Sequence, residues 1–469
     1  MFDSTLSIDL GASYTKVALR KKCVPSEMGQ TEQYAKLLMV DGSPLIPTIA
    51  IRTGRKSQPW VFGQQAAKLN PAGMQVFQNW KANLFRPKND QDSAGAVLVA
   101  GHFFDWLREK VEDAGVLPKS VHVRIALPAF RNSENIALVI ARCMDLSGWD
   151  SPLILRATEP HANVVGLFSN GRNVSMRNAA GSVRLHYGAT FDFQGPYIQA
   201  ARSYVLQGTR TNLFDALVID IGAFTVDFAA MTFDFGTSDG GDGLKIVREE
   251  SHALGVVHDL DRPVLASLGK RHNFDSADLS FTDQELLKHA LYHGKPHTLL
   301  TRGRGSIRLG DDLDLKTVDA VCSGFSDAIR RQVEMFLDAG RRPSIAFITG
   351  GGAKIVAVAE NLKGWLRSKR ISVVPIEDEE SPTGQANWRK WEDTGEGLNR
   401  LATALGCAST VLQDSEELLS ESRSSLAETK PAAVQRASAD SERRLVPCRC
   451  QGGNKDCCFC GGRGQYYNK

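Results

Sequence analysis

Hydrophobic and polar positions predict alternating strands and helices from residue 1 to about residue 411. Short apolar runs of β type alternate with longer segments whose apolar residues recur at helical spacing. The clearest predicted strands span residues 121–127, 217–220, 224–231 and 345–349. The clearest predicted helices span residues 103–114, 133–146, 317–339 and 397–412. Such alternation is typical of an α/β protein.

Three stretches interrupt this pattern. Residues 170–212 are rich in Gly, Arg, Asn and Ser and are typical of an inserted hairpin or mobile loop, and residues 236–243 have the small side chains of a hairpin tip. Ser, Glu, Arg and Ala dominate residues 413–444, which lack aromatics and cannot bury enough surface to offset the entropy of ordering. The chain therefore divides into a large α/β region at 1–412, a flexible linker at 413–445 and a cysteine-rich tail at 446–469.

Two nearly identical motifs lie about half the chain apart. Residues 6–15 and residues 217–227 are each predicted to form an apolar strand that stops at an aspartate (Asp9 or Asp220) and turns on a glycine. Tight turns expose backbone N–H donors, and aspartates hold the water shell of a cation. The pair of motifs therefore suits a nucleoside triphosphate and its magnesium ion.

A third glycine turn completes the set. Residues 345–354 form a predicted strand that ends in three glycines before a helix, where backbone can approach a ligand closely and a helix N-terminus favours phosphate. One such turn alone is weak evidence, but three in this order are more specific. The repeat predicts two related lobes, approximately residues 1–215 and 216–412, that share one cleft.

Composition and charge narrow the functional class. At 469 residues, with 42% hydrophobic and 23% charged residues, the chain fits a soluble protein of two or three domains. A net charge of +3, from 56 basic and 53 acidic residues, gives no indication of nucleic-acid binding. The first motif begins within ten residues of Met1, and no apolar run approaches the length of a membrane span. We therefore expect a cytoplasmic protein with no membrane partner.

The three turns, in this order, resemble those of the actin, heat-shock protein 70 and sugar-kinase superfamily, and most closely the ATPase domain of DnaK-type chaperones. Further similar segments lie between them in the family order, at residues 45–50, 61–81, 126–130 and 158–162. The resemblance covers residues 1 to about 411. It implies an actin-like, two-lobed ATPase fold made of duplicated ribonuclease H-like domains.

The resemblance also implies a role for each matching residue. Lys81 would neutralise charge that develops on the γ-phosphoryl group. Glu159 would orient the attacking water, with help from Asp220. Asp9 and Asp220 would hold magnesium through bound waters, with Asp227 as a further carboxylate. ATP or ADP would be bound by residues of the three turns: Asp9, Gly11, Ala12, Ser13, Tyr14, Gly222, Ala223, Phe224, Thr225, Asp227, Gly350, Gly351 and Gly352.

Other interpretations of some of these residues stay open. Lys81 could be a surface lysine, because one extra residue precedes it relative to the family spacing, and Glu159 could be a carboxylate favoured at a helix start. For the adenine contacts, the sequence suggests only the segment 283–289, without naming individual residues. Ala223 and Phe224 stand where the family usually has glycine, and the phenyl ring adds bulk where backbone approaches the γ-phosphate. Slow or absent turnover is therefore expected.

The chain has no room for the peptide-binding sandwich and helical lid of these chaperones, since 469 minus 411 leaves only 58 residues. We therefore expect an ATP-binding, slowly hydrolysing switch of DnaK-like type that acts through an unidentified client or co-chaperone. A filament-forming relative of ParM-like actins is the alternative, suggested by residues 306–315 and by Lys16 after the first loop, so self-assembly stays open. A sugar kinase is a weaker interpretation, because no acceptor-binding motif is found.

The tail carries the remaining chemistry. Five of the nine cysteines lie within its residues 448–460, where a metal site is more plausible than disulfides in a reducing compartment. Residues 457–464 fit C-x-x-C-x-G-x-G, which resembles the zinc repeats of DnaJ co-chaperones. Two cysteine pairs at glycine turns can complete a tetrahedron. We predict zinc at Cys448, Cys450, Cys457 and Cys460; a reactive thiol tail without metal is the alternative.

Overall fold

The computed structural model describes most of the first 408 residues and two short segments near the end. The described residues are 4–21, 35–149, 158–169, 213–235, 242–301, 305–337, 342–374, 398–408, 445–447 and 465–467. The predicted insertion at 170–212, most of the predicted linker and the tail cysteines lie outside these residues.

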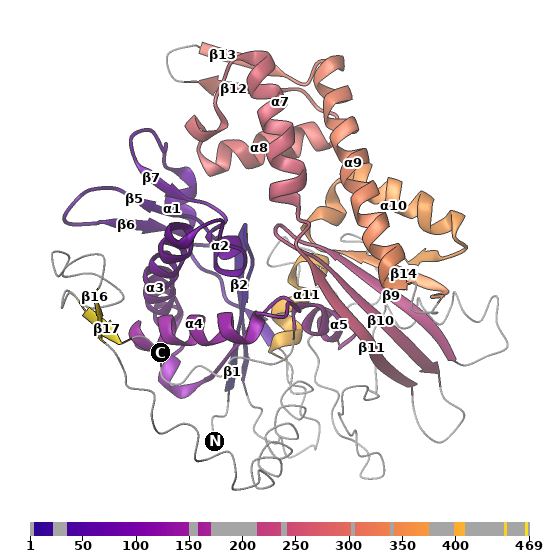
Figure 1. The fold of residues 1–469 in the computed structure, drawn as a ribbon, viewed down its shortest axis with the longest axis horizontal. Coiled ribbons are helices and arrows are strands. Elements are labelled where there is room, and N and C mark those ends of the chain that lie inside the picture. The colour runs from indigo at the N-terminus through magenta and orange to yellow at the C-terminus, as the bar shows by residue number, and fades with distance from the viewer. Residues whose placement is uncertain are drawn as a thin grey trace, which may run out of the picture. The chain divides into compact units, whose positions relative to one another are not determined.

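The chain divides into two compact units, Met1–Glu416 and Glu417–Lys469. Within the second unit, the described residues are two short strands, β16 (Leu445–Pro447) and β17 (Gln465–Tyr467), which pair antiparallel. The first unit is mixed α/β and is built on two five-stranded sheets (Figure 1), so the predicted α/β class is confirmed.

The first sheet has the strand order β3-β2-β1-β8, with β4 paired to β2. Its strands are β1 (Ser4–Leu10), β2 (Tyr14–Lys21), β3 (Ala35–Leu37), β4 (Ile46–Pro47) and β8 (His122–Ala126). β1 pairs antiparallel with β2 and parallel with β8. Nearly every residue of β1 is buried, as expected for a strand covered on both faces.

The second sheet repeats this plan in the order β11-β10-β9-β14-β15. Its strands are β9 (Leu213–Ile221), β10 (Val226–Phe235), β11 (Asp242–His252), β14 (Ile345–Thr349) and β15 (Ser372–Val374). β9 pairs antiparallel with β10 and parallel with β14, just as β1 does with β2 and β8. The repeated sequence motif therefore falls at the same place in both sheets, at the end of β1 and of β9.

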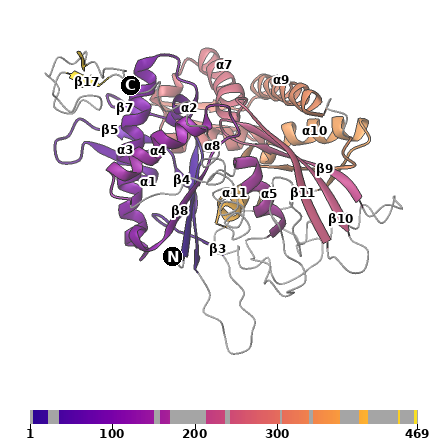
Figure 2. The ribbon, with the colours of Figure 1, turned by 60° about the horizontal axis from the view of Figure 1, so that its bottom comes forward.

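Helices cover both faces of each sheet. One hydrophobic core joins the first sheet to α2 (Trp80–Phe85), α3 (Asp90–Asp113) and α4 (Ser133–Leu146). A second core joins the other sheet to α7 (Arg262–His272), α8 (Phe281–Tyr292), α9 (Asp312–Leu337) and α10 (Val356–Ser368). A third core, between the two sheets, contains α5 (Glu159–Ser169) and α11 (Leu398–Cys407) (Figure 2).

The remaining elements are short. A small sheet, β6-β5-β7, consists of β5 (Ala50–Arg52), β6 (Trp60–Phe62) and β7 (Gln75–Phe77) and lies beside α1 (Gly63–Lys68). β12 (His297–Thr301) and β13 (Gly305–Leu309) form a hairpin. Single turns of other helix types are η1 (Pro118–Ser120), η2 (Val256–Asp261), η3 (Ser276–Asp278) and η4 (Gly351–Lys354). Among the described residues, no helix has both the length and the apolarity to cross a membrane.

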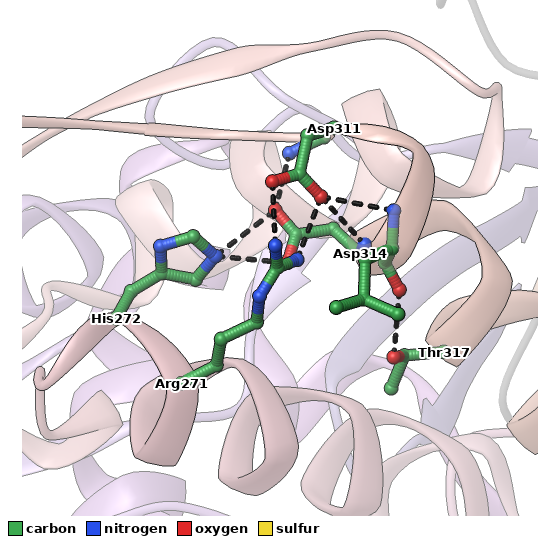
Figure 3. Close-up of polar contacts among 7 residues, drawn as sticks. Arg271, His272, Asp311, Asp314 and Thr317 are labelled. Atoms are coloured by element: carbon green, nitrogen blue, oxygen red, sulfur yellow. Dashed lines mark hydrogen bonds and ion pairs between the residues drawn. The ribbon is translucent and has the colours of Figure 1, made fainter.

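A polar network fixes the start of α9 against the end of α7 (Figure 3). Asp311 accepts the Leu313 and Asp314 backbone N–H groups and two bonds from Arg271. The fully buried Asp314 carboxylate accepts from the Gly310 backbone and lies 2.8 Å from His272 Nε2. The bonds from the Leu313 and Asp314 backbone satisfy two of the orphan donors at the helix N-terminus. Arg271 holds the pKa of Asp311 down at about 2.

The two helices between the sheets touch through their backbones. A Cβ added at Gly166 of α5 would lie 1.8 Å from the Ala402 carbonyl oxygen, and one added at Gly406 of α11 would lie 1.8 Å from the Ala162 carbonyl oxygen. Only glycine permits this separation, because any side chain would have to occupy a neighbouring backbone. The C-terminal end of α11 is also fastened to the first sheet, where Arg20 Nε donates to the Ala408 carbonyl at 2.8 Å.

We expect Gly406→Ala to lower the free energy of unfolding by about 2 kcal/mol or more, because overpacking forces the backbones apart. Gly364→Ala is the matched control: it lies on an exposed face of α10 with no atom near the added methyl, so it should stabilise by up to about 1 kcal/mol. Chemical denaturation of the three proteins measures both effects. Equal stability of wild type and Gly406→Ala would contradict the close crossing.

Candidate functional site

The three glycine turns meet at one pocket in the first unit. Its lining includes every turn residue and every catalytic residue predicted from the sequence: Asp9, Gly11, Ala12, Ser13, Tyr14, Lys81, Glu159, Asp220, Gly222, Ala223, Phe224, Thr225, Asp227, Gly350, Gly351 and Gly352. The first loop joins β1 to β2, the second joins β9 to β10, and the third leads from β14 into η4. The structure thus brings Asp9 and Gly350 to one pocket, although they are 341 positions apart in the chain (350 minus 9). The roles of the lining residues remain predictions.

The third turn shows why glycine is needed there. Gly350 has a φ of +86°, which side chains rarely adopt, and a Cβ on it would lie 2.1 Å from Asp220 Oδ1. A Cβ on Gly352 would lie 2.3 Å from Ile221 Cγ2. The third turn therefore packs directly against the end of β9, and this contact holds the floor of the pocket in place.

The first hairpin carries an ion pair into the pocket. Asp9 and Lys16 are direct partners in the β1–β2 register, and Lys16 Nζ lies 2.8 Å from Asp9 Oδ2. Both side chains are largely buried, with exposed fractions of 7% and 15%. The sequence did not predict Lys16 as a site residue. Its spacing of seven positions from Asp9 allows the two residues to face each other across a hairpin of two strands.

The second hairpin places two carboxyls at the equivalent positions. Asp220 and Asp227 are direct partners in the β9–β10 register, again seven positions apart, and both are buried. Asn163 Nδ2 donates to Asp220 at 2.7 Å, and Thr225 Oγ1 donates to Asp227 at 2.9 Å. Burial, together with neighbouring carboxylates, raises the pKa of each carboxyl to about 7.

A buried ion pair links α2 to the start of α5. Lys81 Nζ lies 2.5 Å from Glu159 Oε1, and the two residues are only 2% and 6% exposed. The interpretation of Lys81 as a surface lysine is therefore wrong. Glu159 begins α5 next to the end of β8, because its backbone N–H donates to the Leu127 carbonyl at 2.7 Å. Burial raises the pKa of Glu159 to about 8, even though the neighbouring Lys81 opposes this rise.

Residues of α8 and η2 also line the pocket. Lys288 Nζ and the Tyr292 hydroxyl donate to Asp261 at 2.7 and 2.6 Å, and Lys288 also pairs with Glu285. Tyr14 of the first loop donates to Glu285 at 3.2 Å. Glu285 and Lys288 fall in the segment suggested for adenine contacts, whereas Asp261 and Tyr292 were not foreseen because no local motif marks them.

The predicted magnesium site is not supported. No group of three or more His, Cys, Asp or Glu side chains able to hold a metal ion occurs in the described part of the chain. The physical reason lies in the partners of the two predicted ligands, since Asp9 is bonded to Lys16 and Asp220 to Asn163. The predicted magnesium cofactor is therefore corrected.

The predicted zinc site is not supported by the described residues either. Its predicted ligands (Cys448, Cys450, Cys457 and Cys460) lie outside the residues that the structure describes. The cysteines that the structure does describe are Cys143, Cys322 and Cys407, and each is buried as a free thiol. No metal-binding group is found among the residues described. The function proposed below therefore uses neither metal.

Phe224 lines the pocket, but its ring packs into the core of the first sheet. The residue is 7% exposed, and its ring packs with Phe85 and Phe130 in the core of the first sheet. Much of the bulk expected beside a γ-phosphate is thus directed into this core.

No protein-family model and no curated protein matches the chain.

The raised carboxyl pKa values predict a pH dependence of stability without ligand. The folded state holds protons on Glu159, Asp220 and Asp227 that the unfolded chain releases above about pH 4. Their contribution to stability is therefore complete below that pH and is lost as pH rises through 7 to 8. We expect a lower melting temperature at pH 8.5 than at pH 6, and a smaller difference in Asp227→Asn, whose amide does not titrate.

Differential scanning calorimetry at the two pH values measures this. Asp145→Asn, at an exposed position of α4, serves as the control and should leave the difference unchanged. If Asp227→Asn melts with the full wild-type pH dependence, the buried carboxyl pair does not hold extra protons.

Proposed function

We propose that this chain is an ATP-binding conformational switch with the two-lobed architecture of the actin and heat-shock protein 70 superfamily. The observation that carries the proposal is the convergence of three glycine turns on one pocket. It is supported by the matching strand order of the two large sheets and by the position of both D-x-G turns at the ends of β1 and β9. The switch acts through a partner protein.

Lysines supply positive charge at the phosphate end of this proposed site. Lys16 and Lys81 approach the pocket from β2 and α2, and each is paired with a carboxylate. A triphosphate gives both lysines further anionic oxygens to bind. Partial protonation of Asp220 and Asp227 near neutral pH lowers the repulsion that the phosphates would otherwise meet.

Glu159 is the candidate base for hydrolysis, and its setting favours slow turnover. One of its oxygens is bonded to Lys81, and burial raises its pKa to about 8, so Glu159 holds a proton at neutral pH more readily than an ordinary glutamate does. A protonated carboxyl cannot accept a proton from water. The site would thus bind ATP and cleave it slowly, which suits a switch better than a metabolic kinase.

ATP binding is the first test. We expect isothermal titration calorimetry with ATP to detect one site, and Lys16→Met or Lys81→Met to weaken it about 10- to 100-fold, the usual worth of a hydrogen bond to a charged group. Lys68→Met, on an exposed position of α1, is the matched control and should bind as wild type does.

Wild-type protein that takes up no ATP would overturn the proposal. Light scattering of the same samples separates the alternative, because a filament-forming actin relative should scatter more after ATP is added. Binding without assembly favours the switch.

Hydrolysis should depend on pH through Glu159. Because the base form of a group with a pKa of about 8 rises from a small to a large fraction, phosphate release should increase roughly tenfold between pH 7 and pH 9. Glu159→Gln should abolish release while ATP still binds. A rate that is flat over this pH range, or unchanged in Glu159→Gln, would show that another group activates the water.

A further inference from the structure

The second pocket loop carries an aromatic ring that is buried in the core of the first sheet. Phe224 lies between β9 and β10, yet its ring centroid is 6.1 Å from that of Phe85 and 6.0 Å from that of Phe130. Phe85 and Phe130 are themselves 5.8 Å apart, so the three rings form a closed cluster. We call it the aromatic clasp.

The clasp reaches the helix that carries Lys81. Phe85 is the last residue of α2, four positions after Lys81 and therefore on the same side of this short helix. The Phe85 carbonyl accepts a hydrogen bond from Asn132 Nδ2 at 3.0 Å, and Trp80 at the other end of α2 packs on Phe103. The Phe85 ring therefore connects the clasp directly to the helix that carries Lys81.

The backbone of the second loop is gripped from its other side. The backbone N–H groups of Val256 and Val257 donate to the carbonyls of Gly222 and Ala223, both at 3.0 Å. A Cβ added at Gly255 would lie 2.5 Å from Phe224 Cα, so the turn before η2 lies directly on the loop. The loop must move together with this turn.

We propose that Phe224 is a positioning residue, whose ring makes α2 and Lys81 follow the second loop of the pocket. Contact between packed rings transmits a displacement in either direction, whereas the hydrogen bonds to Val256 and Val257 keep the loop backbone in place without the ring. Loss of the ring uncouples Lys81 from the loop and leaves the loop itself intact. The clasp rests on geometry alone, and only the role of Lys81 toward ATP rests on the function proposed above.

The decisive readout is the accessibility of the Lys81 amine, which needs no nucleotide. Lys81 is 2% exposed, so acetylation by an N-hydroxysuccinimide ester, followed by peptide mass spectrometry, should be slow in wild type. We expect Phe224→Leu to raise the labelling rate of Lys81 severalfold and to leave that of the surface residue Lys68 unchanged. Phe224→Met serves the same purpose should the leucine variant fail to fold.

A matched control separates positioning from general destabilisation. Phe168→Leu removes another buried ring from the separate core between the sheets, where it packs on Phe233 and Phe347. Its Lys81 labelling should stay at the wild-type rate. Equal labelling of Lys81 in the Phe224 and Phe168 variants, or no increase in either, would overturn the proposal.

A double-mutant cycle gives an independent check. In thermal unfolding, the shifts in melting temperature caused by Phe224→Leu and Phe85→Leu should fall clearly short of additive in the double variant, because each removes the same contact. Phe224→Leu and Phe168→Leu should add. Additive shifts in the first pair would show that the rings are not coupled. Since neither measurement uses ATP, failure to bind ATP would remove the proposed function and leave the clasp to be judged on its own results.

Discussion

The close crossing of α5 and α11 is the constraint on which the pocket depends. The two helices occupy the space between the sheets, and their separation is set by backbone contact at Gly166 and Gly406. α5 begins with Glu159 and carries Asn163, which donates both to Asp220 of the second sheet and to Thr403 of α11. A wider crossing would therefore break one of the two bonds by which Asn163 joins Asp220, at the end of β9, to Thr403 of α11. The packing of two glycines fixes the geometry of a polar site several residues away.

The two hairpins at the pocket show how one backbone plan can give opposite electrostatics. Each places two side chains seven positions apart in direct register, Asp9 with Lys16 and Asp220 with Asp227. The first pair is neutral overall, and the second is two like charges, which directly opposite positions disfavour. Burial resolves the conflict in the second hairpin by favouring the protonated form, so part of the pocket's charge depends on pH near neutrality.

The sequence predicted the parts of this site that local patterns encode. Apolar runs located the strands, and an aspartate followed by a glycine marks the point where β1 and β9 end, so both loops were found. Asp261 and Tyr292 could not be found in this way, because their contact joins η2 to α8 and depends on tertiary packing. Lys16 could have been found from hairpin register alone. Magnesium was predicted from residue type and position, but the expected ligands already have protein partners, which only the folded arrangement of Lys16 and Asn163 reveals.

Phe224 shows that a local pattern can also predict an obstruction that the folded structure relieves. A phenyl ring in a phosphate loop suggests an obstruction when the loop is considered alone, because the backbone there must approach a ligand. In the folded chain, Phe85 and Phe130 provide an apolar site for the ring, and the loop backbone is fixed by Val256 and Val257. The loop can therefore contribute its backbone to the pocket and its side chain to the opposite core at once. A residue that departs from a motif is thus better understood from the surface its side chain contacts than from the motif it interrupts.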